Sequence, residues 1–502
     1  MPTLLSETLR EVITAHSIVV AQLAKQTEIN RTTLQHIISG RRVPSKEQMD
    51  RLLLAIPIPE QQKTVLRQAY EFTTHGPDKF EQREKVKTII EKIAFASMGE
   101  LSVTTPPQIS GDPGGALGEA PGGVPSGASG EAPDGASSGI PGTRKAENLY
   151  GIPAIHDALV NIIAEEEDSV SFFMPPNFPF FYDTLLAKYT TSQTLALTCF
   201  FPMSNEADNI IPDLEYCEAF IPFFASPKYS FQAYYMRGQN ALSDASIVPF
   251  PYFVLTSRFV LLLSADMAHA LLTKEDAFVR MYHKKCQGFL NISSPLYTAP
   301  PLEELIMFLP QTPSKDVFAA LENQPCFQYY LTEQIIKKYA IATTAEHIAL
   351  VQKYTKYINE MKKEPDLFSA FGQEGLDYFV ETGYISVWPP SLGKPLGVSD
   401  RIKLLQRMLN DIKSDVFNCR LVDASKFTIP SRTVTIAIRR KTLFVQCLDY
   451  AGGNVKNICL TEKNIVDAFT DFLSNLPKTG LLHSKEETVS AFEAALEKLR
   501  AG

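Results

Sequence analysis

The alternation of apolar and polar residues near the start of the chain predicts a bundle of short helices. Residues 18–45 contain two short helical segments joined by a turn. On a wheel of 3.6 residues per turn, the apolar residues of the second segment share one side: Leu34, Ile37 and Ile38. Its polar residues share the other side: Thr32, Gln35, His36 and Ser39. We therefore expect one side of this helix to pack and the other to face the solvent.

The flanking segments complete a small helical domain. Ser6 is placed to cap a first helix, and Ser45 with Gln48 forms a capping-box pattern before a fourth. Further helices are predicted over 60–72 and 77–96. The last of these has an apolar stripe made of Phe80, Val86, Ile89, Ile90 and Ile93. The stripe could pair with a second copy of the chain or pack within its own domain, and the pattern leaves both interpretations open.

The composition then changes abruptly. Residues 103–142 are dominated by Gly, Pro, Ala and Ser, which cannot form a core. We assign 1–100 to the helical domain, 101–147 to a disordered, flexible linker and 148–502 to a C-terminal region. A flexible chain of about 40 residues has a reach on the order of 35 Å. The N-terminal domain is therefore expected to be tethered and not rigidly mounted.

Helices and strands alternate in the C-terminal region, which predicts an α/β fold. The predicted strands are 170–174, 194–201, 229–236, 252–256, 260–264, 417–422, 433–438 and 443–449. A helical middle section over 322–361 separates the first five from the last three, so that the region could hold two related halves, 148–300 and 400–502. The predicted fold class is multidomain, with an all-α N-terminal domain and an α/β C-terminal region.

Charge and cysteine content narrow the function classes. The 502 residues have a formal net charge of −8, whereas the first 100 contain 14 Lys and Arg against 12 Asp and Glu. Any affinity for nucleic acid must therefore come from a focused basic patch, made here by Arg31, Arg41, Arg42 and Lys46. The seven cysteines include no C-x-x-C pair, and no secretion signal or membrane span is apparent. We expect reduced thiols, no zinc site and a cytoplasmic location.

Residues 18–45 resemble the helix-turn-helix of the phage-repressor and Cro family. The matching positions are Leu23, Ala24, Ile29, Asn30, Thr33, Leu34, Ile37, Gly40, Arg42, Pro44 and Ser45. Asn30 is placed to cap the second helix and Gly40 to end it. Two positions depart from the pattern: Val20 replaces a phosphate-contacting Gln, and Glu28 replaces the Gly of the turn.

The resemblance and the polar helix face together imply that the chain reads double-stranded DNA in the major groove. The expected DNA-binding residues are Asn30, Arg31, Thr32, Thr33, Gln35, His36, Ser39, Arg41, Arg42 and Lys46. The polar side chains would meet base edges, and the arginines and the lysine would meet phosphates.

The order of elements over 150–300 and 400–480 resembles the phospholipase-D-like fold, which also serves without catalysis as a sensor domain behind some bacterial DNA-binding modules. A catalytic member needs H-x-K-x-x-x-x-D in each half, because a His attacks the phosphodiester. Two H-x-K strings occur, at 283–285 and 483–485, and neither has the Asp. We therefore expect no enzyme activity, no cofactor and no metal.

Two further stretches leave alternatives open. The acidic run 165–168 is most simply a solvated face, although it could be a contact surface for a basic partner. The aromatic and proline-rich stretch 172–182 favours core packing, with ligand binding at the end of a strand as the alternative.

These observations favour a cytoplasmic, bacterial one-component transcription regulator that binds DNA as a homodimer. Its C-terminal region would be a non-catalytic sensor or oligomerisation domain for an unknown small-molecule or protein effector. The alternative is a scaffold or defence-type adaptor that uses the helix-turn-helix for protein contacts.

Overall fold

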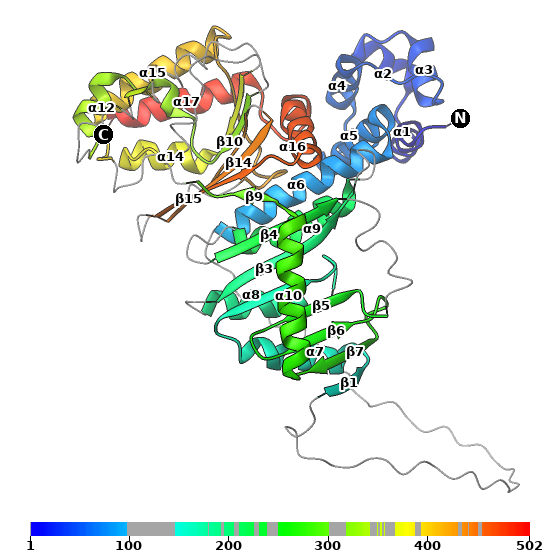
Figure 1. Ribbon diagram of the computed structural model, residues 1–502. Coiled ribbons are helices and arrows are strands. Elements are labelled where there is room, and N and C mark those ends of the chain that lie inside the picture. Colours follow the sequence, from blue (N-terminus) through cyan, green and yellow to red (C-terminus); the bar gives the residue numbers. More distant parts are fainter. Residues whose placement is uncertain are drawn as a thin grey trace, which may run out of the picture.

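The computed structural model describes residues 2–97 and 146–501, apart from 179, 192–194, 205–209, 225–229, 238–248, 301–317, most of 342–366, 387–392, 430–433, 440 and 450–453. Within these residues the chain forms an N-terminal helical module and an α/β region of two sheets (Figure 1). The predicted linker, 101–147, lies almost entirely outside the described residues.

Five helices build the N-terminal module: α1 (Leu4–Ala15), α2 (Val20–Thr27), α3 (Arg31–Ile38), α4 (Lys46–Ala55) and α5 (Glu60–His75). Their apolar faces meet in one core. The capping box of Ser45 and Gln48 at α4 is confirmed. At α1 the prediction was wrong in detail, because Thr3 is the cap and Ser6 returns the bond from inside the first turn.

Helix α6 (Pro77–Ser97) leaves the module and packs on the α/β region, where it contacts α9 (Ile211–Phe224) and α16 (Lys463–Asn475). Most of its apolar stripe is buried in the same core cluster as residues of both sheets: Val86, Ile89, Ile90 and Ile93. Arg83 pairs with Asp471 of α16 at 2.8 Å, and Lys85 pairs with Glu218 of α9 at 2.9 Å. The stripe therefore packs on neither of the two expected partners, and α6 mounts the module on the α/β region.

The first sheet has the order β1-β7-β6-β5-β2-β3-β4-β8. Its strands are β1 (Ala146–Tyr150), β2 (Ser169–Phe173), β3 (Ala196–Met203), β4 (Ser230–Arg237), β5 (Tyr252–Leu255), β6 (Val260–Leu263), β7 (His269–Thr273) and β8 (Ser294–Pro295). Strands β2, β3 and β4 are parallel, and β5, β6 and β7 form an antiparallel meander beside β2. The helices α7 (Ile152–Ala164), α8 (Phe181–Thr191) and α9 share one core with this sheet. A separate core lies under α10 (Asp276–Ile292).

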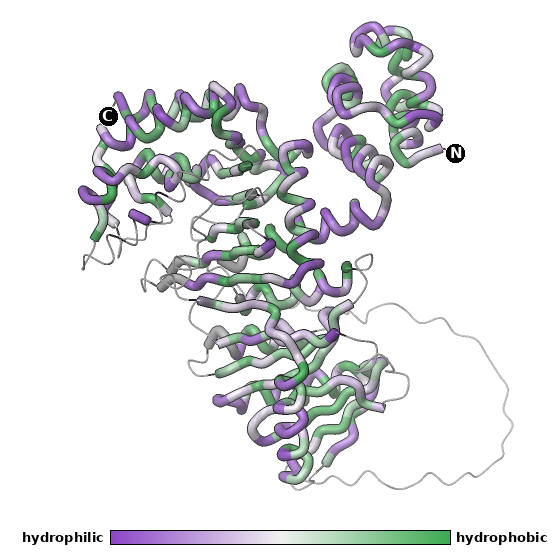
Figure 2. The backbone as a smooth tube through the Cα atoms, turned by 45° about the horizontal axis from the view of Figure 1, so that its top comes forward, coloured by the Kyte–Doolittle hydropathy of each residue, from purple (hydrophilic) through white to green (hydrophobic). Residues whose placement is uncertain are grey.

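The second sheet has the order β12-β11-β10-β13-β14-β15-β9. Its strands are β9 (Tyr297–Thr298), β10 (Phe318–Glu322), β11 (Leu367–Phe371), β12 (Asn418–Leu421), β13 (Val434–Arg439), β14 (Thr442–Asp449) and β15 (Asn454–Leu460). The accompanying helices are η1 (Phe327–Tyr330), α12 (Glu333–Tyr339), α14 (Gln373–Thr382), α15 (Val398–Lys413), α16, η2 (Leu476–Lys478) and α17 (Lys485–Ala501). Figure 2 shows that hydrophobic residues run along the strands, whereas helices such as α15 and α17 alternate hydrophobic and hydrophilic residues.

The two sheets repeat one topology. In each, three parallel strands are followed by an antiparallel meander that starts beside the first of the three: β2, β3 and β4 with β5–β7, and β10, β11 and β12 with β13–β15. The last meander strand then pairs with an earlier strand, β1 or β9. The expected related halves are therefore present, but the second begins near residue 297 and not at 400. The predicted helical middle, 322–361, starts at the last residue of its first strand, β10, and ends before its second, β11.

The aromatic and proline-rich stretch 172–182 is largely structural. The aromatic rings of Phe172, Phe173, Phe178 and Phe181 are buried in the cores of the first sheet, whereas Phe180 is half exposed. Core packing is therefore the main use of this stretch.

Among the helices of the described residues, none is long and apolar enough to cross a bilayer.

Candidate nucleic-acid interface

Helix α3 is fixed in the module by its apolar side. Leu34 and Ile37 are at most 1% exposed, and they pack in the module core with Leu23 and Ala24 of α2. The Oδ1 atom of Asn30 accepts a hydrogen bond from the Thr32 N–H at 2.9 Å, which confirms the predicted cap. Gly40 has φ 76°, the left-handed conformation that ends a helix without steric cost. The packing and both ends of α3 therefore agree with the prediction.

The turn between α2 and α3 keeps a left-handed residue although the chain has no glycine there. Glu28 ends α2 with φ 54° and ψ 25°. The guanidinium of Arg51 in α4 lies 3.7 Å from the Glu28 carboxylate and donates a hydrogen bond to the carbonyl of Thr27 at 3.3 Å. Arg51 thus supports the end of α2 in a conformation that costs a side-chain-bearing residue about 1–2 kcal/mol.

The predicted reading face of α3 is open to solvent. Thr32, Gln35, His36 and Ser39 are all exposed, while Thr33 is half-buried. Ser39 donates to the carbonyl of His36 at 3.1 Å. The Oδ1 atom of Asn30 is engaged in the cap, which leaves the amide nitrogen of this exposed side chain as the group that could donate to a partner.

The predicted basic residues flank α3 along the chain: Arg31 begins it, Arg41 and Arg42 follow its end, and Lys46 begins α4. Arg31, Arg41, Arg42 and Lys46 are exposed, and in the described part of the chain none of them has a carboxylate within ion-pair distance. Val20, which stands where the related pattern has a phosphate-contacting Gln, packs instead against the module core. The cations are therefore free to meet an external anion. At position 20 of α2, however, no polar side chain is available to contact a phosphate.

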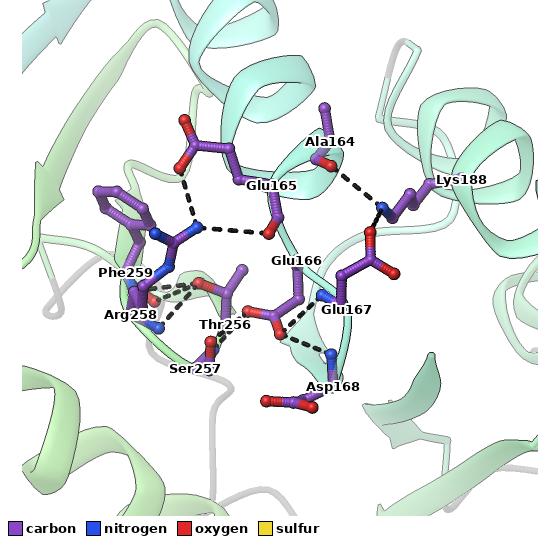
Figure 3. Close-up of polar contacts among 10 residues, drawn as sticks. All are labelled: Ala164, Glu165, Glu166, Glu167, Asp168, Lys188, Thr256, Ser257, Arg258 and Phe259. Carbon is purple, nitrogen blue, oxygen red and sulfur yellow. Dashed lines mark hydrogen bonds and ion pairs between the residues drawn. The ribbon is translucent and has the colours of Figure 1, made fainter. Parts of the chain in front are cut away.

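The run 165–168 is not a uniformly solvated face. Glu166 is only 2% exposed, and its Oε1 accepts from three successive backbone N–H groups, the shortest bond being 2.8 Å from Asp168. Its Oε2 accepts from the N–H and the Oγ of Ser257, both at 2.7 Å (Figure 3). Burial raises the pKa of Glu166, but these hydrogen bonds outweigh it and lower the pKa. This carboxylate ties the start of β2 to the β5–β6 turn, while Glu165, Glu167 and Asp168 remain exposed.

Sequence reasoning missed a polar cluster that joins the two halves. Arg237 at the end of β4 pairs with Glu462, which also caps α16 by accepting from the Ile465 N–H at 2.9 Å. Nearby, Asp213 at the start of α9 accepts from the Ser204 N–H at 3.0 Å, while its buried Oδ2 has no hydrogen-bond partner within the described residues. Burial raises the pKa of Asp213 to about 6. The cap position of Glu462 was the only local signal of this cluster.

The two H-x-K strings lie on a helix and before a helix, and neither lies within a strand. His283 is exposed on α10, and His483 precedes α17, where it lies 3.4 Å from Glu487. The Lys285 ammonium lies over the rings of Tyr282, Phe253 and Phe289. These strings are therefore parts of helix packing and of a helix start.

No protein-family model and no curated protein sequence matches the chain. Solved structures similar to it include TrmBL2, an archaeal chromatin protein that shows a novel mode of DNA binding. The identity is 10%, the match covers 32% of this chain and 57% of TrmBL2, and the TM-score is 0.22. A phosphatidylserine synthase of Haemophilus influenzae Rd KW20 matches at 8% identity over 71% of this chain and 92% of its own, with a TM-score of 0.24. A polyphosphate kinase of Porphyromonas gingivalis matches at 9% identity over 71% and 55%, with a TM-score of 0.20.

These comparisons correct one expectation. The sequence predicted that the chain is not an enzyme, and two of the similar structures, each matched over 71% of this chain, are enzymes. The absence of catalysis is therefore not retained. At these TM-scores the similar structures assign no reaction to the chain, and the chain spans little more than half of TrmBL2 and of the kinase.

Proposed function

We propose that the chain binds double-stranded DNA through α3 and acts as a cytoplasmic transcription regulator of the one-component type. The observation that carries the proposal is that α3 has one buried apolar side and one exposed polar side. The buried side of this helix is fixed by Leu34 and Ile37, and its polar side is exposed. The helix is flanked along the chain by cations that have no ion pair in the described chain. A helix of this kind can enter a major groove, read base edges and meet phosphates at both ends.

The mounting of the module supports a regulatory role. Because α6 is buried against α9 and α16, a change in the relative position of the two halves would move α5 and the rest of the module with it. A single small module touches too little DNA for tight selective binding. We therefore propose a homodimer in which two such modules meet adjacent half-sites.

The proposal is tested by titrating the full chain onto genomic fragments at several salt concentrations. Replacing both Arg41 and Arg42 by Ala should weaken binding to all sequences alike and reduce the salt slope by about 2. Arg407 of α15 is exposed and lies outside the module, so Arg407→Ala is the matched control. If the wild-type chain binds no fragment at low salt, the adaptor function becomes the better account of the helix-turn-helix.

A further inference from the structure

A cavity of about 910 Å³ lies between the N-terminal module and the second half of the α/β region. Helices α4, α5 and α6 supply one wall, and β12, η2 and the segment that leads into α17 supply the other. A volume of this size is at the upper end of the range of small-molecule sites, roughly 300–1,000 Å³, and such sites are common between structural units.

Basic side chains outnumber acidic ones in the lining of this cavity. Eight Lys or Arg side chains line it against four carboxylates. Five of them lie within ion-pair distance of a carboxylate: Arg83 with Asp471 and Glu71, Lys426 with Asp423, Lys485 with Asp415, Lys87 with Glu91 and Arg67 with Glu60. Others are not: in the described chain Lys46 has no carboxylate partner, and Arg420 donates only to the carbonyl of Cys419 at 3.3 Å. Lys46 belongs to the module wall and Arg420 to the opposite wall, so the unpaired charge faces the cavity from both sides.

A further basic group of the cavity lacks a hydrogen bond. The Nη1 atom of Arg67 in α5 is buried without a hydrogen-bond partner within the described residues, and the nearest carboxylate oxygen, of Glu60, is 3.6 Å away. The stem of Arg67 is held against the backbone of the opposite wall, because a Cβ added at Gly480 would lie 2.8 Å from its Cδ. The guanidinium therefore stays at the cavity, where an anion could satisfy it.

The same cavity has apolar surface on both walls. Met49 and Leu53 contribute it from α4, and Phe472 and Leu481 contribute it from the second half. A ligand that satisfied only the cations would leave this surface in contact with water. A ligand that combined an anionic group with an apolar body would use both.

We propose that this cavity binds a small organic anion, which carries a phosphate, sulfonate or carboxylate group on an apolar or aromatic body. The anionic group lies between Lys46 and Arg420, and the body lies on the apolar surface. Because the ligand bridges the module and the second half, its binding fixes their separation. Lys46 is also one of the proposed phosphate contacts on DNA, so the anion and DNA are linked ligands. Binding of the anion itself requires no DNA.

The test uses two fluorescent probes on the full chain without DNA: 8-anilinonaphthalene-1-sulfonate, which is anionic, and N-phenyl-1-naphthylamine, its uncharged analogue. We expect the anionic probe to saturate one site with the higher affinity. Lys46→Ala and Arg420→Ala should each weaken it by at least about fivefold and leave the neutral probe unchanged. Arg407→Ala, on an exposed arginine outside the cavity, should leave both probes unchanged.

Equal affinity for the two probes would overturn the proposal. So would an affinity for the anionic probe that falls in only one of the two variants, Lys46→Ala or Arg420→Ala. Lys46→Gln and Arg420→Gln, which keep much of each stem, repeat the test if an alanine variant shifts the unfolding transition. Failure of DNA binding would leave the probe result untouched, so that the two proposals are tested separately.

Discussion

Glu28 shows how one residue holds the geometry on which the DNA-binding proposal depends. The turn between α2 and α3 requires a left-handed residue, and the related pattern supplies Gly there. This chain places a glutamate at φ 54° and supports it with Arg51. The left-handed conformation of Glu28 costs about 1–2 kcal/mol of steric strain, while an exposed ion pair stabilises the fold by at most about 1 kcal/mol.

Glu28→Gly should therefore stabilise the module. We expect a gain of about 0.5–1 kcal/mol in the free energy of unfolding, because the relief of strain exceeds the loss of the pair with Arg51. Denaturant unfolding of the full chain, with hydrogen exchange in α2 and α3 as the probe, measures this gain. Lys25→Gly, inside α2, is the control and should lose about 1 kcal/mol. A destabilised Glu28→Gly variant would show that the ion pair matters more than the strain.

The raised pKa of Asp213 makes the stability of the folded chain depend on pH. Its pKa is raised by burial to about 6 in the folded chain, from the ordinary value of 3.8. The folded state thus holds the proton more tightly, so this group's contribution to stability is complete below about pH 4 and is lost as the pH rises through about 6.

Asp213→Asn removes this dependence, because the amide carries no charge at any of these pH values. The variant should be more stable than the wild type at pH 8 by up to about 3 kcal/mol and nearly equal to it at pH 4. Unfolding free energies of the two proteins between pH 4 and 8 provide the comparison. A constant difference across this range would show that Asp213 does not titrate there.

At the scale of elements, the sequence predicted what local signals determine. The apolar sides of α1 to α5, the cap by Asn30 and the end at Gly40 each depend on residues within one or two turns of one another. Strands β10 and β11 were missed because FAALE and LFSAF are short apolar runs that fit a buried helix as well as a strand. Their identity is set by parallel pairing with each other across a long separation in sequence.

The partner of α6 could not be predicted for the same reason. Its stripe shows that one side is buried, but nothing in the stripe tells which surface covers it. The structure places α9 and α16 there, and Ile90 at the centre of the contact is fully buried. The Asp213, Arg237 and Glu462 cluster is equally non-local, since it combines residues of both halves.

Ile90→Ala tests the burial of α6. Removing this side chain should cost about 2–5 kcal/mol, because it leaves a cavity in a contact that the surroundings cannot close. Glu81→Ala, at an exposed position of the same helix, should change the stability by less than about 0.5 kcal/mol. Similar unfolding curves for the two variants would mean that α6 is not docked in solution.

At the scale of the whole molecule, α6 makes the module and the α/β region one unit. If a protease site is introduced at 120–121 and cleaved, the two fragments should stay together in gel filtration, held by the apolar stripe and by the pairs of Arg83 and Lys85. Ile90→Asp should release them, because it places an unpaired charge in the contact. If the fragments without the Ile90→Asp substitution separate at micromolar concentration, the module is held to the α/β region by the linker alone.

The central claim is that α3 reads base edges, and selection of binding sites from random DNA by the full chain tests it most directly. The wild type should enrich one motif, and Gln35→Ala should lose the preference at one or two positions of it, at a cost of about 1–3 kcal/mol. Gln26→Ala, exposed on α2 and outside the reading face, should return the wild-type motif. Recovery of that same motif by Gln35→Ala with unchanged affinity would contradict the account.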